Sequence, residues 1–206
     1  MSPRRIVDVL VAGIALLLLA PVLAALALAV RLTSPGPAFF RQVRIGRGGR
    51  PFVLLKLRTM WAAASGPRLT GAADARVTPL GGWLRRWKLD ELPQLLNVLR
   101  GDMTLIGPRP EVPEYLARLG PAGHDYVAVR PGLADAATVE FYDEAGMLAG
   151  APDPERVYVE RILPEKARVS VAYARAQTLA SDLRLVWVLV RRVAGVPTAP
   201  ALRHGR

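Results

Sequence analysis

Residues 9–30 read VLVAGIALLLLAPVLAALALAV, and no side chain in this stretch carries a charge. About 20 residues of apolar helix are enough to cross the hydrocarbon core of a bilayer. A secretory signal peptide fits poorly, because its apolar region usually has about 7 to 15 residues and no small-residue cleavage site precedes the basic sequence that follows. A core helix that is apolar all round would need a larger soluble domain than the remaining chain provides. We therefore predict a membrane-embedded helix over residues 1–32.

Pro21 lies near the middle of this stretch. A proline inside a helix removes one backbone hydrogen bond and clashes with the preceding turn, at a cost of about 3 kcal/mol, so we expect a bend there. Basic residues flank the stretch on both sides, and positive residues prefer the cytoplasmic side of a membrane. They are Arg4 and Arg5 before it and Arg31, Arg41, Arg44, Arg47 and Arg50 after it. A re-entrant helix bent at Pro21 keeps both flanks inside, and we predict this form over the alternative, an ordinary kinked span.

The composition narrows the chemistry that the rest of the chain can perform. Its 206 residues include 28 Lys and Arg against 17 Asp and Glu, for a net charge of +11, and no cysteine. Disulfides, thiolate metal sites and thiol nucleophiles are therefore excluded. The positive charge is concentrated in residues 31–60, which contain no acid. A nucleic acid or an anionic membrane surface explains such a patch. The adjoining apolar helix favours the membrane, so we expect membrane lipids and no nucleic acid as partners.

After the apolar stretch, the pattern predicts an α+β catalytic domain over residues 33–195 and a short tail over 196–206. Residues 38–45 and 51–57 look like two strands of a β-hairpin, joined by the glycines between them. Residues 61–78 are small and polar, as in a mobile loop over a site or an ordinary surface loop. Most of the remaining sequence has helical periodicity, so we expect the domain to be small and mostly helical.

The C-terminal third reads as two helices, the second beginning at Ser181 or Asp182 and ending before Gly195. One face of this second helix combines apolar and basic residues, as do helices that lie in a membrane interface. The apolar members are Leu183, Val186, Trp187, Leu189 and Val190, and the basic ones are Arg184, Arg191 and Arg192. The pattern indicates an interfacial amphipathic helix, and a core helix fits it equally well.

A shorter helix is predicted by the sequence LDELPQLLNVLRGD, in which leucines recur at i, i+3, i+4 and i+7. These leucines are Leu92, Leu95, Leu96 and Leu99. Gly101 supplies a stop, and Pro93 is tolerated only in the first turn, so the helix should begin near Asp90. Asp90 and Glu91 would then lie at its N-terminus, where the positive end of the helix dipole favours ionised carboxylates.

Adjacent residues on a helix point roughly 100° apart, so Asp90 and Glu91 suit different tasks. One carboxylate can attack a substrate while the other holds a cation. Mg²⁺ is usually bound by one or two carboxylates together with substrate phosphates. Zinc is not expected, because His124 and His204 are isolated in the sequence. The alternative is structural, with Asp90 capping the helix and Glu91 complementing its dipole, and spacing alone leaves both interpretations open.

Basic residues near these acids suit phosphate chemistry. The candidates are Lys56, Arg58, Arg85, Arg86, Lys88 and Arg109. Arg109 lies between two prolines, which would hold its guanidinium in place for bidentate phosphate binding. Lys56 and Arg58 share one face of the second strand because they are two residues apart. Solvated surface charge is the alternative for each, and we favour it for Arg86 and Lys88. The sequence has no P-loop, GxGxxG or GxSxG motif, so NTPase, dinucleotide-dependent and serine hydrolase functions lack support.

Taken together, several segments resemble the bacterial sugar transferase family, the small monotopic phosphoglycosyl transferases that initiate polysaccharide and glycoprotein glycan assembly. The segments are RRIVDVLVAG, SPGPAFFRQVRIGRGGRPFVLLKLRTM, RRWKLDELPQLLNVLRGDMTLIGPRPEVPEYL and RPGL. The resemblance extends over about residues 4–193 and is densest from Leu89 to Pro110. It implies transfer of a sugar 1-phosphate from a UDP-sugar to polyprenol (undecaprenyl) phosphate, with release of UMP and with Mg²⁺ as cofactor. The protein would be monotopic in the inner (plasma) membrane and would face the cytoplasm.

The resemblance also implies roles for individual residues. Asp90 would attack the β-phosphorus of the UDP-sugar to form a sugar-phosphoryl aspartate, which the polyprenol phosphate would then attack. Asp90 and Glu91 would also be the residues that bind Mg²⁺. Lys56, Arg85 and Arg109 match basic positions of the family's active site and would stabilise phosphoryl charge.

Other positions are assigned less directly by the resemblance. Arg130, in the RPG turn, is implied as a nucleotide contact. The family's helix break is usually Ser-Pro, whereas Ala20 precedes Pro21 here, so no hydroxyl can bond back to the preceding turn. The sequence LADAAT follows RPG, where the family commonly has Thr-Gly. A later acidic position of the family matches Glu155 or Asp153. A homo-oligomer is left open, and the alternative function is a membrane-tethered basic binding module without catalysis.

Overall fold

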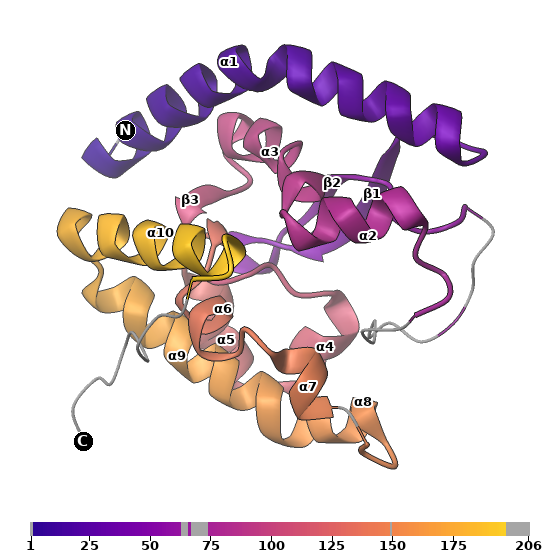
Figure 1. Ribbon diagram of the computed structural model, residues 1–206. Coiled ribbons are helices and arrows are strands. Elements are labelled where there is room, and N and C mark those ends of the chain that lie inside the picture. The colour runs from indigo at the N-terminus through magenta and orange to yellow at the C-terminus, as the bar shows by residue number, and fades with distance from the viewer. Residues whose placement is uncertain (1, 63–65, 67–73, 149, 197–206) are drawn as a thin grey trace.

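The computed structural model describes residues 2–62, 66, 74–148 and 150–196. Over these residues the chain is mostly helical, with two small two-stranded sheets and one long apolar helix near the N-terminus (Figure 1). This agrees with the predicted combination of helices and a hairpin. In the predicted loop 61–78, residues 63–65 and 67–73 lie outside the described residues, as does 197–206 of the predicted tail.

Helix α1 (Pro3–Thr33) is, within the described residues, the one helix long and apolar enough to cross a membrane. It remains helical through Pro21 and arches over the rest of the molecule (Figure 1). One face packs on the domain through residues such as Ala12 and Val30. The other face is apolar and exposed along the whole helix. Its large side chains are Ile6, Val7, Leu10, Val11, Ile14, Leu17, Leu18, Val22, Leu28 and Leu32.

Polar contacts attach the N-terminal end of α1 to the domain. Arg5 donates hydrogen bonds to the carbonyl oxygens of Val98 and Leu99, at 2.6 and 3.0 Å. These carbonyls belong to the last turn of a helix, where backbone acceptors lack intrahelical partners. Asp8 is buried and accepts a hydrogen bond of 2.6 Å from the Thr104 hydroxyl. The charged residues at the start of α1 are therefore bonded to the domain.

Arg58 attaches the C-terminal end of the same helix. Its Nη2 donates hydrogen bonds to the carbonyl oxygens of Val30 and Ser34, at 3.3 and 2.8 Å, and to the Ser34 hydroxyl at 2.9 Å. Arg58 is 6% exposed, and backbone and side-chain oxygens occupy the two terminal nitrogens of its buried guanidinium. The structure thus gives a residue considered for phosphate binding an anchoring position, and it fastens both ends of α1 to one domain.

Strands β1 (Phe39–Ile45) and β2 (Pro51–Leu57) form the predicted hairpin around the 3₁₀ turn η1 (Arg47–Gly49). The strands are antiparallel, and their register runs from the Phe39–Leu57 pair to the Ile45–Pro51 pair. Asn97, which is fully buried, lies against the edge of β2 that does not pair with β1. Its side-chain amide donates to the Val53 carbonyl at 2.8 Å and accepts from the Leu55 N–H at 3.1 Å. These bonds replace those of a third strand and fix the hairpin to the helix that contains Asn97.

The next elements are α2 (Pro79–Arg86), the 3₁₀ turn η2 (Leu89–Glu91) and α3 (Gln94–Arg100). Helical backbone begins near Asp90, as predicted, but as the 3₁₀ turn η2, and the α-helix itself begins only at Gln94. Lys88 has a φ of 57°, in the left-handed region, and starts a separate tight turn that contains Asp90 and Glu91. Pro93, which lacks an N–H, then occupies the N-cap of α3. Gly101 ends α3 in the left-handed conformation, as predicted.

After α3 the chain contains two short strands and a series of helices. The remaining elements are β3 (Thr104–Ile106), α4 (Pro113–Arg118), α5 (Pro121–Ala128), β4 (Gly132–Ala134), α6 (Ala136–Glu140), α7 (Glu144–Leu148), α8 (Pro154–Val157), the π-helical turn η3 (Tyr158–Ile162), α9 (Leu163–Ala176) and α10 (Leu179–Val193). Strands β3 and β4 pair in parallel. A Cβ on Gly132 would lie 2.1 Å from the Gly107 backbone N, so this approach requires glycine. The pairing places the loop after β3 against the start of α6.

Helix α10 begins at Leu179, earlier than the predicted start at Ser181 or Asp182. Thr178 is its N-cap, and its hydroxyl accepts a hydrogen bond from the Ser181 N–H at 3.1 Å. The Ser181 hydroxyl in turn accepts from the Thr178 N–H at 2.8 Å, which completes a capping box. The N-cap is therefore Thr178, three residues before the earlier of the two predicted starts.

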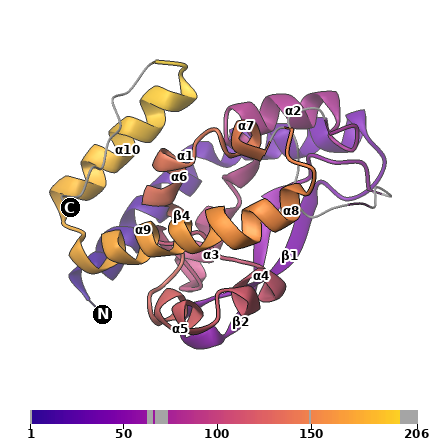
Figure 2. The same ribbon diagram turned by 90° about the horizontal axis from the view of Figure 1, so that it is seen from below.

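The two interpretations of α10 apply to different faces. Leu185 and Val188 are buried against α6 and α9, as in a core helix. The opposite face is apolar and exposed, as in an interfacial helix, and consists of Leu179, Leu183, Val186, Trp187 and Val190. The helix lies beside the N-terminal part of α1 (Figures 1 and 2), where Arg4 and Asp182 form an ion pair of 2.8 Å.

Candidate active site

Glu91 lies at the centre of a buried charge cluster. Its Oε1 is 3.1 Å from Nζ of Lys56, on β2, and 2.6 Å from Nη2 of Arg109, in the loop after β3. Nη1 of Arg109 donates to the other carboxylate oxygen at 3.3 Å, so both terminal nitrogens of the guanidinium bind Glu91. Three of the residues selected from the sequence are thus brought together from three distant segments of the chain.

Asp90 lies beside this cluster and differs from Glu91 in having no partner. It is 6% exposed, and within the described residues it makes no hydrogen bond, its Oδ1 being buried and unsatisfied. No side chain caps η2 or α3, so the interpretation of Asp90 as a helix cap is wrong. A buried carboxylate oxygen without a donor is costly to folding. Such an atom is expected where a substrate or a cation supplies the missing contact.

The two carboxyl groups have opposite electrostatic environments. Burial raises the pKa of Asp90, and the charge of Lys56 only partly opposes this rise. Burial also acts to raise the pKa of Glu91, but the charges of Arg109 and Lys56 outweigh it and hold that pKa well below its usual range. Glu91 therefore stays ionised as a fixed counter-charge, whereas the ionised form of Asp90 is held at a cost in free energy.

Arg85 approaches Asp90 from the last turn of α2. Its Nε donates to the Thr59 hydroxyl at 2.8 Å. Burial lowers the pKa of Arg85, and the negative charge of Asp90 is the largest influence that opposes this. Arg86 and Lys88 are exposed, as the surface-charge interpretation predicted. Arg85 is half-buried and bonded to Thr59, whereas Lys88 is exposed but its charge also acts to lower the pKa of Asp90 and of Glu91.

The backbone of Arg109 is fixed on both sides by residues that sequence reasoning missed. The Asp135 carboxylate, 3% exposed, accepts a hydrogen bond from the Arg109 N–H at 3.0 Å. The Tyr126 hydroxyl donates to the Arg109 carbonyl at 2.5 Å. Asp135 also caps α6 and accepts from the Ser170 hydroxyl at 2.9 Å. The signal was present in LADAAT, where an aspartate precedes a run of small residues that begins a helix.

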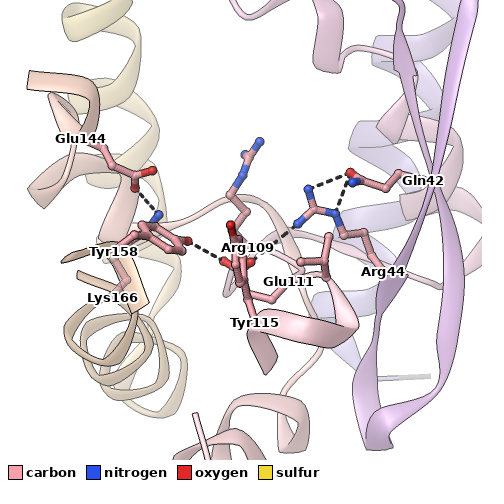
Figure 3. Close-up of a pocket in the computed structure, with 9 residues that line it drawn as sticks. Gln42, Arg44, Arg109, Glu111, Tyr115, Glu144, Tyr158 and Lys166 are labelled. Carbon is pink, nitrogen blue, oxygen red and sulfur yellow. Dashed lines mark hydrogen bonds and ion pairs between the residues drawn. The ribbon is translucent and has the colours of Figure 1, made fainter. Parts of the chain in front are cut away.

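A polar cavity of about 130 Å³ adjoins Arg109. It is lined by Gln42, Arg44, Arg109, Glu111, Val112, Tyr115, Glu144, Tyr158 and Lys166 (Figure 3). Arg44 and Gln42 come from the hairpin, whereas Glu144, Tyr158 and Lys166 form the opposite wall, with Glu111 between them (Figure 3). We call this space the Glu111 cavity. Sequence reasoning missed it, because its walls come from segments that share no motif.

Arg130 lies outside the charge cluster around Glu91. It lines a second cavity, of about 240 Å³, together with arginines at the start of α1 and in the hairpin turn. Within the described residues, no hydrogen bond or ion pair joins Arg130 to Glu91, Lys56 or Arg109. The later acidic candidates are also separate, since Asp153 caps α8 and Glu155 is exposed in its first turn. The geometry thus brings together Lys56, Arg85, Asp90, Glu91 and Arg109.

Such an arrangement suits phosphoryl transfer. It offers a carboxylate that can act as a nucleophile, three cations for phosphate oxygens and an ionised carboxylate that holds two of those cations. No group of three or more His, Cys, Asp or Glu side chains that could hold a metal occurs in the described residues. Asp90, with a buried oxygen that accepts no hydrogen bond, fits Mg²⁺, which commonly takes one or two carboxylates and completes its shell with substrate phosphates and water. Both oxygens of the adjacent Glu91 already accept hydrogen bonds from Lys56 and Arg109.

Comparison with known proteins points to the same chemistry. The model of the bacterial sugar transferase family matches residues 2–195. A UDP-glucose:undecaprenyl-phosphate glucose-1-phosphate transferase of Caulobacter vibrioides is 42% identical over 196 residues, covering 89% of this chain and 66% of that protein. An undecaprenyl-phosphate glucose phosphotransferase of Komagataeibacter xylinus is 36% identical over 201 residues, covering 93% of this chain and 36% of that protein.

A third relative is named for a different sugar. The UDP-N-acetylgalactosamine-undecaprenyl-phosphate N-acetylgalactosaminephosphotransferase of Aeromonas hydrophila is 40% identical over 141 residues, covering 66% of this chain and 33% of that protein. The chain therefore spans from about a third to just under two thirds of the length of these relatives.

Proposed function

Because the chain belongs to the bacterial sugar transferase family, we propose that it transfers a sugar 1-phosphate from a UDP-sugar to undecaprenyl phosphate and releases UMP. The product, a polyprenol diphosphate sugar, would be the first lipid-linked intermediate of a polysaccharide. The observation that carries this proposal is the buried, unpartnered carboxylate oxygen of Asp90 beside the Lys56–Glu91–Arg109 cluster. The names of the relatives support the same donor and acceptor classes.

The reaction has two displacement steps at one phosphorus atom. An Asp90 oxygen attacks the β-phosphorus of the UDP-sugar, the bond from that phosphorus to the bridging oxygen breaks, and UMP leaves with the bridging oxygen. A phosphate oxygen of undecaprenyl phosphate then attacks the sugar-phosphoryl aspartate. The acyl phosphate bond breaks, which restores the Asp90 carboxylate and forms the diphosphate linkage. Covalent catalysis of this kind divides one difficult transfer into two easier ones.

Fixed positive charge stabilises the phosphoryl oxygens as negative charge shifts among them. Lys56 and Arg109 are held by Glu91, and Arg85 approaches from α2, so no long side chain has to be ordered during the reaction. Asp90 and Glu91 would hold Mg²⁺, which neutralises diphosphate charge when it is bound. The unsatisfied Oδ1 of Asp90 supports this assignment most directly, since both oxygens of Glu91 already accept hydrogen bonds.

The contacts of α1 support a re-entrant, monotopic arrangement. The helix has 31 residues and is about 46 Å long at about 1.5 Å per residue, more than the roughly 30 Å of a bilayer core. A straight span would place its two ends on opposite sides of the membrane. Arg5 and Arg58 bind those two ends to one domain, so a helix that enters and leaves through the same leaflet accounts for both sets of bonds.

This geometry would place the active site at the membrane surface. The exposed apolar faces of α1 and α10 would contact lipid, with Trp187 of α10 at the level of the headgroups. A UDP-sugar is a cytoplasmic metabolite, so we assign the domain to the cytoplasmic face of the inner membrane. The acceptor phosphate would then reach Asp90 without leaving the headgroup layer.

The test is UMP release. Purified full-length protein in phospholipid nanodiscs is given undecaprenyl phosphate, Mg²⁺ and each of several UDP-sugars. We expect UMP to form with at least one donor and the Asp90→Asn variant to form none. A membrane-tethered binding module without catalysis predicts no UMP from the unmodified chain, and UMP formation by the Asp90→Asn variant would contradict the proposed nucleophile.

A further inference from the structure

The Glu111 cavity is lined by Arg109, whose guanidinium also binds Glu91 in the charge cluster. The Arg109 guanidinium extends away from Glu111 to reach Glu91, while the residue also lines the cavity (Figure 3). A ligand whose phosphates contact Arg109 therefore has this space directly beside it. The cavity is polar, and the mechanism described above uses none of its other residues.

Glu111 has unused hydrogen-bonding capacity. It is 5% exposed, and its closest polar contacts are long, with the Tyr158 hydroxyl at 3.3 Å and Nη1 of Arg44 at 3.7 Å. The Arg44 guanidinium is bonded instead to Gln42 and to the Pro110 carbonyl. An ionised carboxylate offers about four acceptor positions, so a ligand can still bond to Glu111.

The opposite wall adds a second carboxylate and a cation. Nζ of Lys166, on α9, lies 2.5 Å from the Glu144 carboxylate, on α7. The same Nζ is 5.3 Å from the centre of the Tyr158 ring. Tyr115 and Tyr158 pack with their ring centres 5.2 Å apart, and both border the cavity. The walls therefore combine two carboxylates, several cations, an amide and two aromatic rings around a small space.

We propose that the Glu111 cavity holds the sugar ring of the UDP-sugar and selects which sugar is transferred, an inference that rests on the proposed function. The chemistry of the walls favours a polyhydroxylated ring over uracil. Carboxylates accept hydrogen bonds from hydroxyl groups. A hexose presents several hydroxyl donors, whereas the uracil base of UDP presents a single N–H donor. Glu111 and Glu144 together supply more acceptors than a uracil base can use.

The position of the cavity agrees with this assignment. The sugar is attached to the β-phosphate, which is the phosphate that Asp90 attacks. The ring must therefore lie within one phosphate of the cations that stabilise the transfer, and Arg109 is the cation shared by the cluster and the cavity. The wall formed by Glu144, Tyr158 and Lys166 comes from α7, η3 and α9, which supply none of the five residues of the candidate active site. Sugar preference could thus change without loss of the phosphoryl-transfer residues.

The experiment compares donors in two variants that keep side-chain size, Glu144→Gln and Tyr158→Phe. Rates of UMP release give kcat/KM for UDP-glucose, UDP-galactose, UDP-N-acetylglucosamine and UDP-N-acetylgalactosamine, and UMP inhibition gives the affinity for the nucleotide alone. Glu165→Gln is the control, since Glu165 is on the same helix as Lys166 but pairs with Arg168 on the surface. Thermal unfolding in nanodiscs checks that each variant is folded.

We expect the ratio of kcat/KM between the best and the second donor to change by about tenfold or more in Glu144→Gln or Tyr158→Phe, because loss of one bond to a substrate hydroxyl has an effect of this order. The inhibition constant of UMP should stay within about twofold, and the control should leave both quantities unchanged. Folded variants with an equal loss for every donor, or with weaker UMP inhibition and unchanged donor ratios, would overturn the proposal. Failure of the unmodified protein with every donor would instead overturn the proposed function, and this inference with it.

Discussion

Arg109 binds Glu91 through two hydrogen bonds, of 2.6 and 3.3 Å, in a buried pair that joins the loop after β3 to the turn before α3. Glu91 has a structural role as well as a functional one, because the same carboxylate also accepts a hydrogen bond from Lys56 at 3.1 Å. Its neighbour Asp90 is equally buried and has no such partner. The predictions below follow from this difference between adjacent residues.

Replacing Glu91 with glutamine should destabilise the fold as well as abolish transfer. The change leaves Lys56 and Arg109, whose side chains are 17% and 31% exposed, without their counter-charge. Removal of one partner from a buried pair typically costs about 3–5 kcal/mol, and we expect the lower end of that range because water partly solvates both cations. At about 2–4 °C per kcal/mol for a chain of this size, the midpoint of thermal unfolding should fall by at least about 6 °C. Glu165→Gln, which affects an exposed pair, is the control and should change the midpoint little.

Replacing Asp90 with asparagine should have the opposite effect on stability while removing activity. The raised pKa of Asp90 means that its carboxyl favours folding when protonated, below the ordinary pKa near 3.8, and that this contribution is lost as pH rises through the folded-state value. At pH 7.5 the ionised group is therefore a cost that asparagine removes. We expect a midpoint about 2 °C or more above that of the unmodified protein at pH 7.5.

The difference in stability between Asp90→Asn and the unmodified protein should disappear in acid. The difference in unfolding midpoint between Asp90→Asn and the unmodified protein should shrink as pH falls through the raised folded-state pKa and vanish below 3.8, where Asp90 is protonated in both the folded and the unfolded state. Thermal scans at a series of pH values measure this. An asparagine variant that is less stable at pH 7.5 would mean that the Asp90 carboxylate has a stabilising partner.

Tyr126 should act on catalysis through Arg109. Its hydroxyl donates to the Arg109 carbonyl at 2.5 Å, so Tyr126→Phe frees one side of that backbone without opening a cavity. We expect kcat to fall about tenfold, the effect of roughly 1.4 kcal/mol, with a much smaller change in KM for the UDP-sugar. The matched control is Tyr142→Phe, which removes a similar hydroxyl-to-carbonyl bond to Arg192, far from Arg109 in sequence. Equal losses in kcat for the two variants would refute a positioning role.

The topology of α1 can be tested with a single introduced cysteine, because the chain has none. Ser2→Cys places a thiol at the N-terminal end of the helix, and Asp125→Cys places one on the exposed surface of the domain. In a re-entrant arrangement, a membrane-impermeant maleimide should label both cysteines from the cytoplasmic side in inverted vesicles and neither in intact spheroplasts. Labelling of Ser2→Cys in spheroplasts would establish a spanning helix.

Parts of this structure could be predicted because local patterns determine them. The apolar run fixes α1, alternation with a glycine turn fixes the hairpin, and Gly101 ends α3. Lys56, Glu91 and Arg109 were selected by residue type and by resemblance, and the fold brings them within hydrogen-bonding distance. The start of α3 was placed about one turn early because a hydrophobic pattern does not distinguish the 3₁₀ turn Leu89–Glu91 from the first turn of an α-helix.

Other parts depend on contacts between distant segments, which a single sequence does not display. Asn97 looks like a polar interruption of a leucine helix, yet it satisfies the edge of β2. Asp135 looks like a helix cap, and it also holds the Arg109 backbone. The Glu111 cavity unites five separate elements and has no linear motif. Arg130 was selected by resemblance, and the fold directs it to another cavity.

The central claim is that Asp90 carries the sugar phosphate during the reaction. The full-length protein should be mixed with a UDP-sugar donor that the UMP-release assay has identified, labelled with ³²P at the β-phosphate, and with Mg²⁺ but no undecaprenyl phosphate. We expect UMP release to stop at about one equivalent and mass spectrometry to locate a sugar-phosphate adduct on Asp90. Addition of undecaprenyl phosphate should then move the label into lipid. If UMP forms only when the acceptor is present and no labelled protein accumulates, transfer is direct and the covalent account is wrong.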